Sequence, residues 1–217
     1  PSTSVPSGGG AAGFVGGTEA PTPTVTPAPT TQPDVPAGNY PFTDMAGSTW
    51  ANEAVEYLYT NKVINGRSET EFAPTATVTR AELVKMICEA LKIAEPTEAV
   101  SFSDVNEADW FASYVNRAAA AGIVKGDGGA FNPNGGVTRE DAALIIFRAL
   151  GLEVSGEITF SDADAVSDYA KEAIASMVNS GYISGMGDGT FAPKATLTRA
   201  QAAQLIYNAL TKGGAAQ

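Results

Sequence analysis

The sequence predicts an all-α, mainly helical protein in which one helical unit occurs three times. Phe-Thr-Asp at 42–44 returns as Phe-Ser-Asp at 102–104 and at 160–162, a period near 60 residues. After each of these tripeptides, apolar residues recur at spacings of three and four, the period of an amphipathic helix. The chain has 217 residues, 44% of them apolar, which is enough to bury one sizeable core shared by the three units.

An aromatic residue opens the first predicted helix of each unit. The stretches read WANEAVEYLYTNKVI, WFASYVNRAAAAGIV and YAKEAIASMVNSGYI. In the first of them, Trp50, Ala54 and Leu58 are predicted to share one helical face. The opening aromatics are Trp50, Trp110 and Tyr169, and the stretches run into Gly66, Gly126 and Gly185.

A turn-rich segment leads to a second predicted helix in each unit. It ends in Phe-x-Pro, and the prolines Pro74, Pro133 and Pro193 each lie six residues before the arginine of a Thr-Arg pair. The helices that follow are apolar almost all round, especially AALIIFRAL. Because a helix of that kind has to be covered on every side, we expect the second helices at the centre and the first helices outside them.

The chain divides into a linker and three repeats. Residues 1–39 are rich in Pro, Thr and Gly and hold too few large apolar side chains to form a core. Their Pro/Thr alternation favours an extended spacer, so we expect an unknown module upstream of it. The three repeats are assigned to 40–99, 100–157 and 158–217.

Charge and composition exclude several functions. With 13 basic and 24 acidic residues the net charge is −11, which disfavours general attraction to nucleic acid or to an anionic membrane. The chain has no histidine, which removes the commonest general base and metal ligand. No run of 18 apolar residues is present, so no membrane insertion is expected. The single cysteine, Cys88, lies in an apolar run and is predicted to be a core thiol.

The second helices begin with a threonine that the capping box explains. In a capping box, an N-terminal threonine and an acid or amide three residues later satisfy each other's backbone N–H groups. Thr79 with Glu82 and Thr198 with Gln201 fit this pattern, and Thr138 with Asp141 fits it loosely.

The arginine that follows each threonine is not explained by capping. The first turn of a helix carries partial positive charge, which disfavours a cation there by about 0.3 to 1 kcal/mol. Two interpretations stay open and are compatible with each other. Each arginine pairs with a carboxylate of the same period, or it joins the helix N-terminus and loop N–H groups in a socket for an anionic ligand. The arginines are Arg80, Arg139 and Arg199, and the carboxylates are Asp44, Asp104 and Asp162.

Catalytic and metal sites are not predicted. The acid pair Glu107 and Asp109 has the residue types of glycoside hydrolysis, but such pairs are expected on the solvated face of an acidic protein. The run DADAVSD at 162–168 suggests a calcium loop, yet Ser167 stands where an EF-hand has glycine and Ala173 where it has glutamate. We therefore expect no enzyme activity and no cofactor.

The order of these motifs resembles the S-layer homology (SLH) domain. It runs Phe-x-Asp, aromatic, helix, Gly, Phe-x-Pro, then Thr-Arg-Ala-Glu/Gln, three times over residues 42 to about 212. The resemblance implies a pseudo-threefold unit of three helix-loop-helix repeats with grooves between them. It also implies an extracellular module that anchors its cargo to the bacterial cell wall. The ligand would be an anionic, often pyruvylated, secondary cell wall polymer linked to peptidoglycan.

By matching position, the resemblance implies roles for most of the repeated residues. Arg80, Arg139 and Arg199 would contact the anionic substituent, and Asp44, Asp104 and Asp162 would orient the arginines or bind sugar hydroxyls. Trp50, Trp110 and Tyr169 would stack on sugar, although an aromatic at a helix start usually packs in the core. Gly66, Gly126 and Gly185 would let a glycan approach the backbone.

Loop charges rank the three arginines, if each loop stays near the arginine of its own repeat. Glu69 and Glu71 would weaken anion binding at Arg80, whereas Lys125 and Lys194 would strengthen it at Arg139 and Arg199. The competing function is a protein-interaction module for lattice self-assembly, which needs an outward apolar patch rather than cationic grooves.

Overall fold

The computed structural model describes residues 38–212, and this part of the chain is mainly helical, as predicted. It contains six α-helices, two short 3-10 helices and isolated β-bridges, and no strand within 38–212. The predicted linker at 1–39 lies outside the described residues except for its last two positions. The elements are η1 (Ala46–Ala51), α1 (Asn52–Thr60), α2 (Arg80–Leu91), α3 (Ala112–Ala120), α4 (Arg139–Leu150), η2 (Ala163–Ala165), α5 (Asp168–Asn179) and α6 (Arg199–Lys212).

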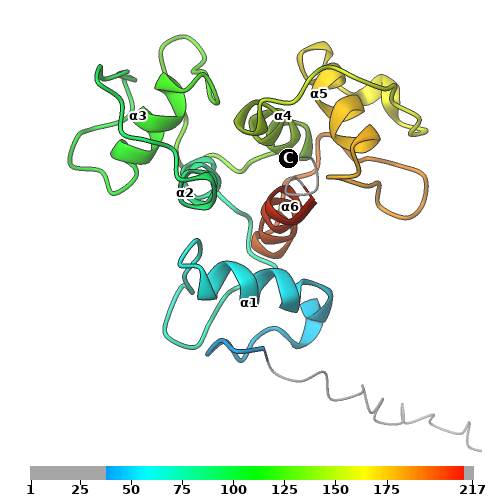
Figure 1. The fold of residues 1–217 in the computed structure, drawn as a ribbon, viewed down its shortest axis with the longest axis horizontal. Helices are drawn as coiled ribbons and strands as arrows, with labels where there is room; N and C mark the ends of the chain where they lie inside the picture. Colours follow the sequence, from blue (N-terminus) through cyan, green and yellow to red (C-terminus); the bar gives the residue numbers. More distant parts are fainter. Residues whose placement is uncertain (1–37, 213–217) are drawn as a thin grey trace, which may run out of the picture. The chain divides into compact units, whose positions relative to one another are not determined.

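The first helix of each repeat packs on the second helix of the preceding repeat. Helix α3 packs on α2, α5 packs on α4, and α1 packs on α6 (Figure 1). Since α1 belongs to the first repeat and α6 to the third, the last of these contacts joins the two ends of the repeat array. The three repeats therefore form a closed ring.

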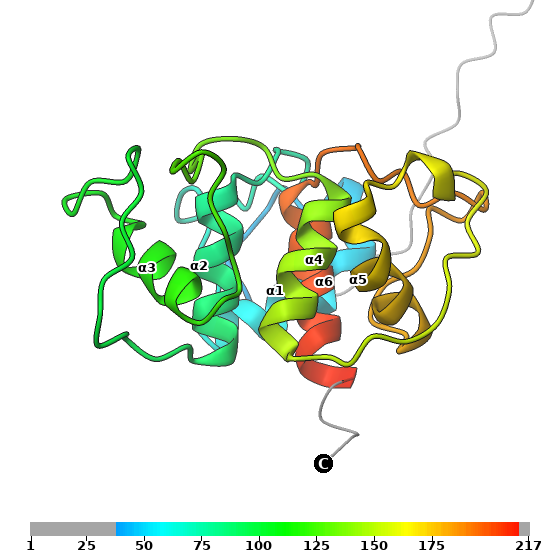
Figure 2. The same ribbon diagram turned by 90° about the horizontal axis from the view of Figure 1, so that it is seen from above.

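The second helices lie at the centre of the ring and the first helices lie outside, which confirms the prediction from their apolar surfaces. Helices α2, α4 and α6 contact one another and run side by side (Figures 1 and 2). Ile87, Ile146 and Ile206, the eighth residue of each helix, are each 2% exposed and border one small apolar cavity between the helices. The core is thus shared by all three repeats.

A cyclic set of backbone hydrogen bonds holds the starts of the three central helices together. The residues involved directly precede the Thr-Arg pairs, and all are buried. The N–H of Val78 donates to the carbonyl of Leu197 at 3.0 Å, Leu197 to Val137 at 2.8 Å, and Val137 to Val78 at 3.3 Å. Each repeat therefore bonds to the other two at this point.

The predicted caps are present. Thr79 Oγ1 accepts from the Glu82 N–H at 3.2 Å, while Glu82 Oε2 accepts from the Thr79 N–H at 2.9 Å. Thr198 and Gln201 make the same reciprocal pair at 3.3 and 3.0 Å. At Thr138 only the first of the two bonds forms, because the shorter Asp141 side chain accepts from the threonine hydroxyl instead.

Cys88 is a buried core thiol, as predicted. Its side chain is 0% exposed, and burial raises the pKa of the thiol to about 11. A thiol with so high a pKa holds almost no thiolate at neutral pH, so its contribution is packing.

Residues 38–212 contain neither a membrane-spanning helix nor a cluster of metal-binding side chains. No helix in this range has both the length and the apolar character needed to cross a membrane. The same residues hold no group of three or more His, Cys, Asp or Glu side chains placed to bind a metal ion.

The structure corrects the expected packing of the opening aromatics. Ala54 and Leu58 are fully buried, but Trp50 is 55% exposed. Trp50 belongs to η1, where Ser48 has non-helical angles (φ −135°, ψ 34°), so it is out of phase with the buried face of α1. Trp110 and Tyr169, at the equivalent positions, are also more than half exposed.

Candidate binding grooves

The arginines of the Thr-Arg pairs reach out of their own repeat and into the connecting loop of the next. The connecting loops are the segments between the first and second helices, at 61–79, 121–138 and 180–198. Nε of Arg80, Arg139 and Arg199 donates to the carbonyl oxygens of Phe131 (3.0 Å), Phe191 (2.7 Å) and Phe72 (2.9 Å), respectively. Nη2 of the same arginines donates to the carbonyls of Lys125 (2.9 Å), Ser184 (3.3 Å) and Asn65 (3.0 Å).

Each guanidinium group also stacks on the phenylalanine whose carbonyl it binds. The guanidinium carbon lies 4.8 to 4.9 Å from the ring centroid in all three cases, a cation–π distance. Arg139 is 8% exposed and Arg199 is 4% exposed. Burial lowers the pKa of all three groups, although an arginine stays charged at neutral pH. The arginines are therefore structural ties between repeats as well as charges.

Carbonyl groups explain why an arginine is tolerated at each helix start. The backbone N–H of Arg80 donates to the carbonyl of Gly135 at 2.9 Å, and that of Ala81 donates to Pro133 at 2.9 Å. Helices α4 and α6 make the same two bonds, α4 to the loop of the third repeat and α6 to the loop of the first. These carbonyls satisfy the first N–H groups and offset their partial positive charge. The helix N-terminus is consequently not a free half of an anion socket.

The three predicted carboxylates support the loops rather than the arginines. Asp44 accepts from the N–H groups of Phe72 and Ala73, at 2.9 and 2.7 Å, with one bond to each carboxylate oxygen. Asp104 and Asp162 make the same pair of bonds in their own repeats. Within residues 38–212 no ion pair joins any of these aspartates to a Thr-Arg arginine, so the direct pairing is not found. Both groups meet at the same phenylalanine, since the aspartate binds its N–H and the arginine its carbonyl.

The aspartates hold a strained turn. The residues after the three phenylalanines have left-handed φ angles, which non-glycine residues rarely adopt. Backbone hydrogen bonds from this turn lower the pKa of Asp104 and Asp162. The turn residues are Ala73 (φ 59°), Asn132 (φ 60°) and Ala192 (φ 56°).

The loop glycines are required by close packing. A Cβ at Gly66 would lie 2.5 Å from the Phe42 ring and 2.4 Å from the carbonyl of Ser68. The equivalent atoms at Gly126 and Gly185 would lie 2.6 and 2.7 Å from Phe102 and Phe160. All three glycines also border the grooves described next, so any side chain there would disturb loop and groove together.

Three grooves lie between the repeats, and each combines residues from all three. A groove takes its arginine from one repeat, its glycine and helical wall from the next, and its exposed aromatic from the third. The volumes of the Gly66, Gly126 and Gly185 grooves are about 290, 640 and 360 Å³. The defining trios are Arg199, Gly66 and Trp110; Arg80, Gly126 and Tyr169; and Arg139, Gly185 and Trp50.

The S-layer homology domain model matches the chain three times, at residues 41–84, 101–143 and 159–203, more than half of its length. The chain belongs to the S-layer homology family. The three matches coincide with the repeats found in the sequence and with the three parts of the closed ring. The resemblance carried by the repeated motifs is thereby confirmed.

Segments similar to this chain occur in relatives whose names describe different kinds of protein. The chain is 39% identical over 171 residues to an amylopullulanase of Thermoanaerobacterium thermosulfurigenes, covering 76% of this chain and 9% of that protein. It is 33% identical to an endoglucanase of Bacillus sp. (strain KSM-635), over 80% of this chain and 19% of the relative. It is 30% identical to the S-layer protein sap of Bacillus anthracis, over 79% of this chain and 21% of the relative. The chain thus spans less than a quarter of each of these relatives.

The two loop lysines of this S-layer homology chain differ in position. Lys125 borders the Gly126 groove, where its carbonyl binds Arg80. Lys194 borders none of the three grooves, and its Nζ instead binds the buried carboxylate of Glu140 and the hydroxyl of Ser167. The placement of the loops also removes the basis for ranking Arg80 last. The loop that carries Glu69 and Glu71 lies beside Arg199, because each arginine meets the loop of the following repeat.

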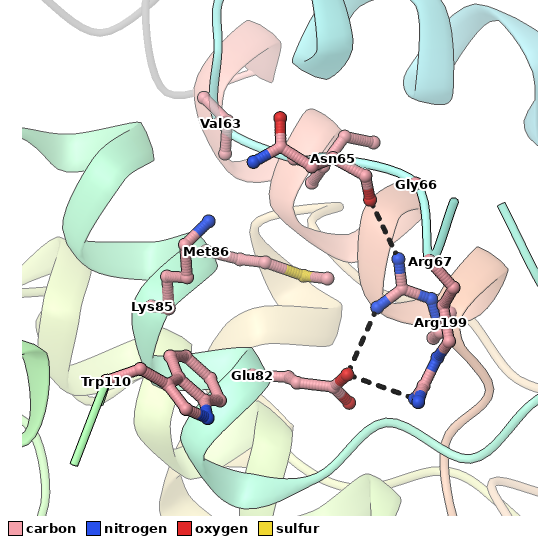
Figure 3. A pocket seen from close by; sticks show the side chains of 10 residues that line it. Val63, Asn65, Gly66, Arg67, Glu82, Lys85, Met86, Trp110 and Arg199 are labelled. Atoms are coloured by element: carbon pink, nitrogen blue, oxygen red, sulfur yellow. Dashed lines mark hydrogen bonds and ion pairs between the residues drawn. The ribbon is translucent and has the colours of Figure 1, made fainter. Parts of the chain in front are cut away.

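Residues on the central helices complete the groove walls. The sequence predicted some of them as helix caps and none of them as groove residues. In the Gly66 groove, Glu82 Oε1 accepts from Arg67 at 3.0 Å and from Nη1 of Arg199 at 3.4 Å (Figure 3). Lys85 and Met86 follow on the same wall. A signal existed in the sequence, since the residue three after the threonine differs among the repeats: Glu82, Asp141 and Gln201.

Glu140 is a further residue near the Gly126 groove that was not predicted from the sequence. It takes the place that alanine has in the other two repeats, as Ala81 and Ala200. Its carboxylate is buried and accepts from the Ser167 N–H and hydroxyl and from the Tyr169 hydroxyl, each at 3.0 Å. The Tyr169 hydroxyl also lies 2.9 Å from Asp141 Oδ1, so its one proton is shared between two carboxylates and the hydroxyl end of this aromatic is held in place.

Proposed function

We propose that this S-layer homology chain anchors a protein non-covalently to the bacterial cell wall by binding an anionic secondary cell wall polymer in its grooves. The observation that carries the proposal is the threefold pairing of a tethered guanidinium group with an exposed aromatic face. Arginine presents planar donors that suit a carboxylate or phosphate. An exposed indole or phenol ring offers a flat apolar face against which the C–H face of a sugar can pack.

The relatives support an anchoring role over a catalytic one. An amylopullulanase, an endoglucanase and an S-layer protein differ in what their names describe, yet each contains a segment similar to this chain. A segment that occurs in such different proteins fits a role in placing each protein at one location better than a role in catalysing one reaction. On this basis we assign the chain to the cell surface, with no enzyme activity of its own.

The competing role in lattice self-assembly has less support. It needs a contiguous apolar patch on the outside of the ring. Seven large apolar side chains are exposed within residues 38–212, and four of them, Trp50, Trp110, Tyr169 and Met186, border the grooves. The exposed apolar surface is thus concentrated where a ligand is expected.

Sedimentation with purified wall sacculi tests the proposal. The full chain should pellet with sacculi that carry their secondary polymer and stay in the supernatant with sacculi whose polymer has been removed by acid extraction. The released polymer, added back in solution, should compete. Equal pelleting with intact and extracted sacculi would show that peptidoglycan itself is bound and that the proposed ligand is wrong.

A further inference from the structure

The three grooves differ in a residue of the helical wall that shares the groove with the arginine. The difference arises at one position of the repeat, the residue three after the capping threonine, which is Glu82, Asp141 or Gln201. Each of these residues begins the helical wall of its groove. Because the arginines are tethered in the same way in all three grooves, this position is where the helical walls differ in charge.

In the Gly66 groove the arginine already has a counter-ion. Glu82 Oε1 accepts from Nη1 of Arg199 at 3.4 Å and from Nη2 of Arg67 at 3.0 Å (Figure 3). Its Oε2 accepts from the N–H of Thr79. The other nitrogens of Arg199 donate to the carbonyls of Phe72 and Asn65. An incoming carboxylate would have to compete for Nη1 of Arg199 with Glu82, which Arg67 and the Thr79 N–H hold in place.

The Gly126 groove is intermediate. Asp141 borders it, but its carboxylate oxygens accept from the hydroxyls of Thr138 and Tyr169, at 2.7 and 2.9 Å. No ion pair joins Asp141 to Arg80 within residues 38–212. The carboxylate nevertheless remains a fixed negative charge in the wall, where it opposes an anionic ligand.

The Gly185 groove has no carboxylate. Of the residues that border it, Arg139 alone is charged, and the helical wall consists of Gln201, Gln204, Leu205 and Asn208. Gln201 caps α6 with its Oε1, as Glu82 caps α2 with its carboxylate, so the cap is kept without the negative charge. Arg139 is buried, and its Nε and Nη2 donate only to loop carbonyls.

We propose that the Gly185 groove is the principal anion site and that Glu82 closes the Gly66 groove to anions as an internal counter-ion. The ligand class is a sugar that carries one carboxylate, which would bind Arg139 while its ring packs on Trp50. Glu82 and Gln201 are the specificity-determining residues. This inference rests on the proposed function, because it assigns the anion of that function to one of three grooves.

Net charge alone would favour the Gly66 groove, since Arg67 and Lys85 add to Arg199 there. Arg67 is 44% exposed, so its charge is screened by solvent and salt. A contact to a buried guanidinium group is screened much less, and that contact is taken by Glu82. The contact of Glu82 with Arg199 therefore affects anion binding in the Gly66 groove more than the added charges of Arg67 and Lys85 do.

The two tryptophans of the chain report on two different grooves, which allows a direct test. Trp50 borders the Gly185 groove and Trp110 borders the Gly66 groove. Each indole N–H gives one signal in a ¹H–¹⁵N spectrum, assigned by Trp50→Phe and Trp110→Phe. The probe is a methyl hexoside that carries a pyruvate ketal, and its control is the same hexoside without the ketal. We expect the ketal to shift the Trp50 signal at concentrations that leave the Trp110 signal unchanged.

A reciprocal exchange of the two residues provides the matched variants. Glu82→Gln should open the Gly66 groove, so that the Trp110 signal also shifts and saturates with the ketal. Gln201→Glu should place a carboxylate beside Arg139 and weaken the response of Trp50 about tenfold, the usual scale for a lost charge-assisted contact. Both changes keep a residue that can cap the helix. Glu89→Gln changes the same charge on α2 at a residue that borders none of the three grooves and binds the Tyr114 hydroxyl, and it should alter neither signal.

The outcomes separate this inference from the proposed function. A ketal that shifts Trp110 first in the unchanged chain, or a Glu82→Gln variant with no new response, would overturn the assignment of grooves while anion binding stands. If neither tryptophan responds to the ketal and the chain also fails to pellet with polymer-bearing sacculi, the proposed function itself is wrong. If the ketal and the neutral hexoside shift Trp50 equally, the groove binds sugar without reading its charge, and the inference fails.

Discussion

Nε of Arg199 donates to the carbonyl oxygen of Phe72 at 2.9 Å, although 127 positions of sequence separate the two residues. The same bond joins Arg80 to Phe131 and Arg139 to Phe191 over about 50 positions. The long bond is the one that closes the ring between the third repeat and the first. With the packing of α1 on α6, it makes the first and last repeats neighbours.

Ring closure predicts that the repeats fold together. Deletion of residues 158–217 removes α6, on which α1 packs, and leaves the carbonyls of Phe72 and Asn65 without Arg199. It also breaks the cyclic hydrogen bonds at Val78 and Val137. We expect the remaining two repeats to lose cooperative thermal unfolding, measured by circular dichroism and calorimetry. A two-repeat chain that still melts in one sharp transition would show that the repeats are independent units.

The buried arginines are predicted to contribute to stability, which matters for any binding test. Arg139→Lys keeps the charge but loses the planar group that stacks on Phe191 and binds two carbonyls. We expect a loss of about 2 to 3 kcal/mol in the free energy of unfolding, measured by urea denaturation. Arg67→Lys, at a partly exposed ion pair, is the control and should cost less than about 0.5 kcal/mol.

Alanine variants of the Thr-Arg arginines affect stability as well as binding. Replacing a Thr-Arg arginine by alanine removes a tie between repeats as well as a ligand contact. A decrease in binding is therefore informative only when the folded fraction is measured in parallel. Equal stability of Arg139→Lys and the unchanged chain would show that the loop carbonyls find other donors, and that the arginine serves the ligand alone.

The lowered pKa values of the loop aspartates predict that the stability of the fold decreases at acidic pH. Backbone hydrogen bonds from Phe131 and Phe191 lower the pKa of Asp104 and Asp162 in the folded state. A carboxylate with a lowered folded pKa stabilises the protein above its unfolded pKa, about 3.9, and this stabilisation is lost as the pH falls through the folded value. We expect the melting temperature of the unchanged chain to fall more steeply below pH 4 than that of Asp104→Asn. Glu107→Gln, a change at an exposed carboxylate, should leave the slope as it is.

Much of the fold could be predicted because the repeated pattern is local. The period, the capping residues and the apolar second helices each depend on residues close in the sequence. The exposure of Trp50 could not be predicted from helical periodicity, since the kink at Ser48 and the 3-10 geometry of η1 shift its phase relative to Ala54. Helical periodicity therefore places Trp50 on the same face as Leu58, whereas Trp50 borders a groove.

The partner of each arginine could not be predicted for a different reason. The three loops share the Phe-x-Pro motif, so this motif alone does not tell which loop accepts from Arg80. The choice is made by closure of the ring, a property of the whole chain that no single motif records. The same closure places the loop that carries Glu69 and Glu71 beside Arg199, so the charges of that loop give no reason to rank Arg80 last.

Glu140 is predicted to stabilise the contact between the second and third repeats. Its carboxylate is 2% exposed and joins the start of α4 to Ser167, Tyr169 and Lys194 of the third repeat. Burial raises its pKa, but the hydrogen bonds from Lys194, Ser167 and Tyr169 more than offset this, so the net pKa is lowered. The carboxylate therefore stabilises the fold at neutral pH and loses that effect as the pH falls through its folded pKa.

Removing the partners of Glu140 one at a time measures separately how much the Lys194 charge and the Tyr169 hydroxyl contribute to the free energy of unfolding. Lys194→Ala leaves a buried carboxylate without its cation and should cost about 1 to 3 kcal/mol in unfolding free energy, less than the loss for a fully buried ion pair, because the side chain of Lys194 is 57% exposed. Tyr169→Phe removes one neutral donor and should cost about 1 kcal/mol. Glu140→Ala restores the residue that the other two repeats carry, and in the double variant with Lys194→Ala the loss should be smaller than the sum of the two single losses. Strictly additive losses in urea denaturation would mean that Lys194 and Glu140 do not act as a pair, and that Ser167 and Tyr169 alone hold the carboxylate.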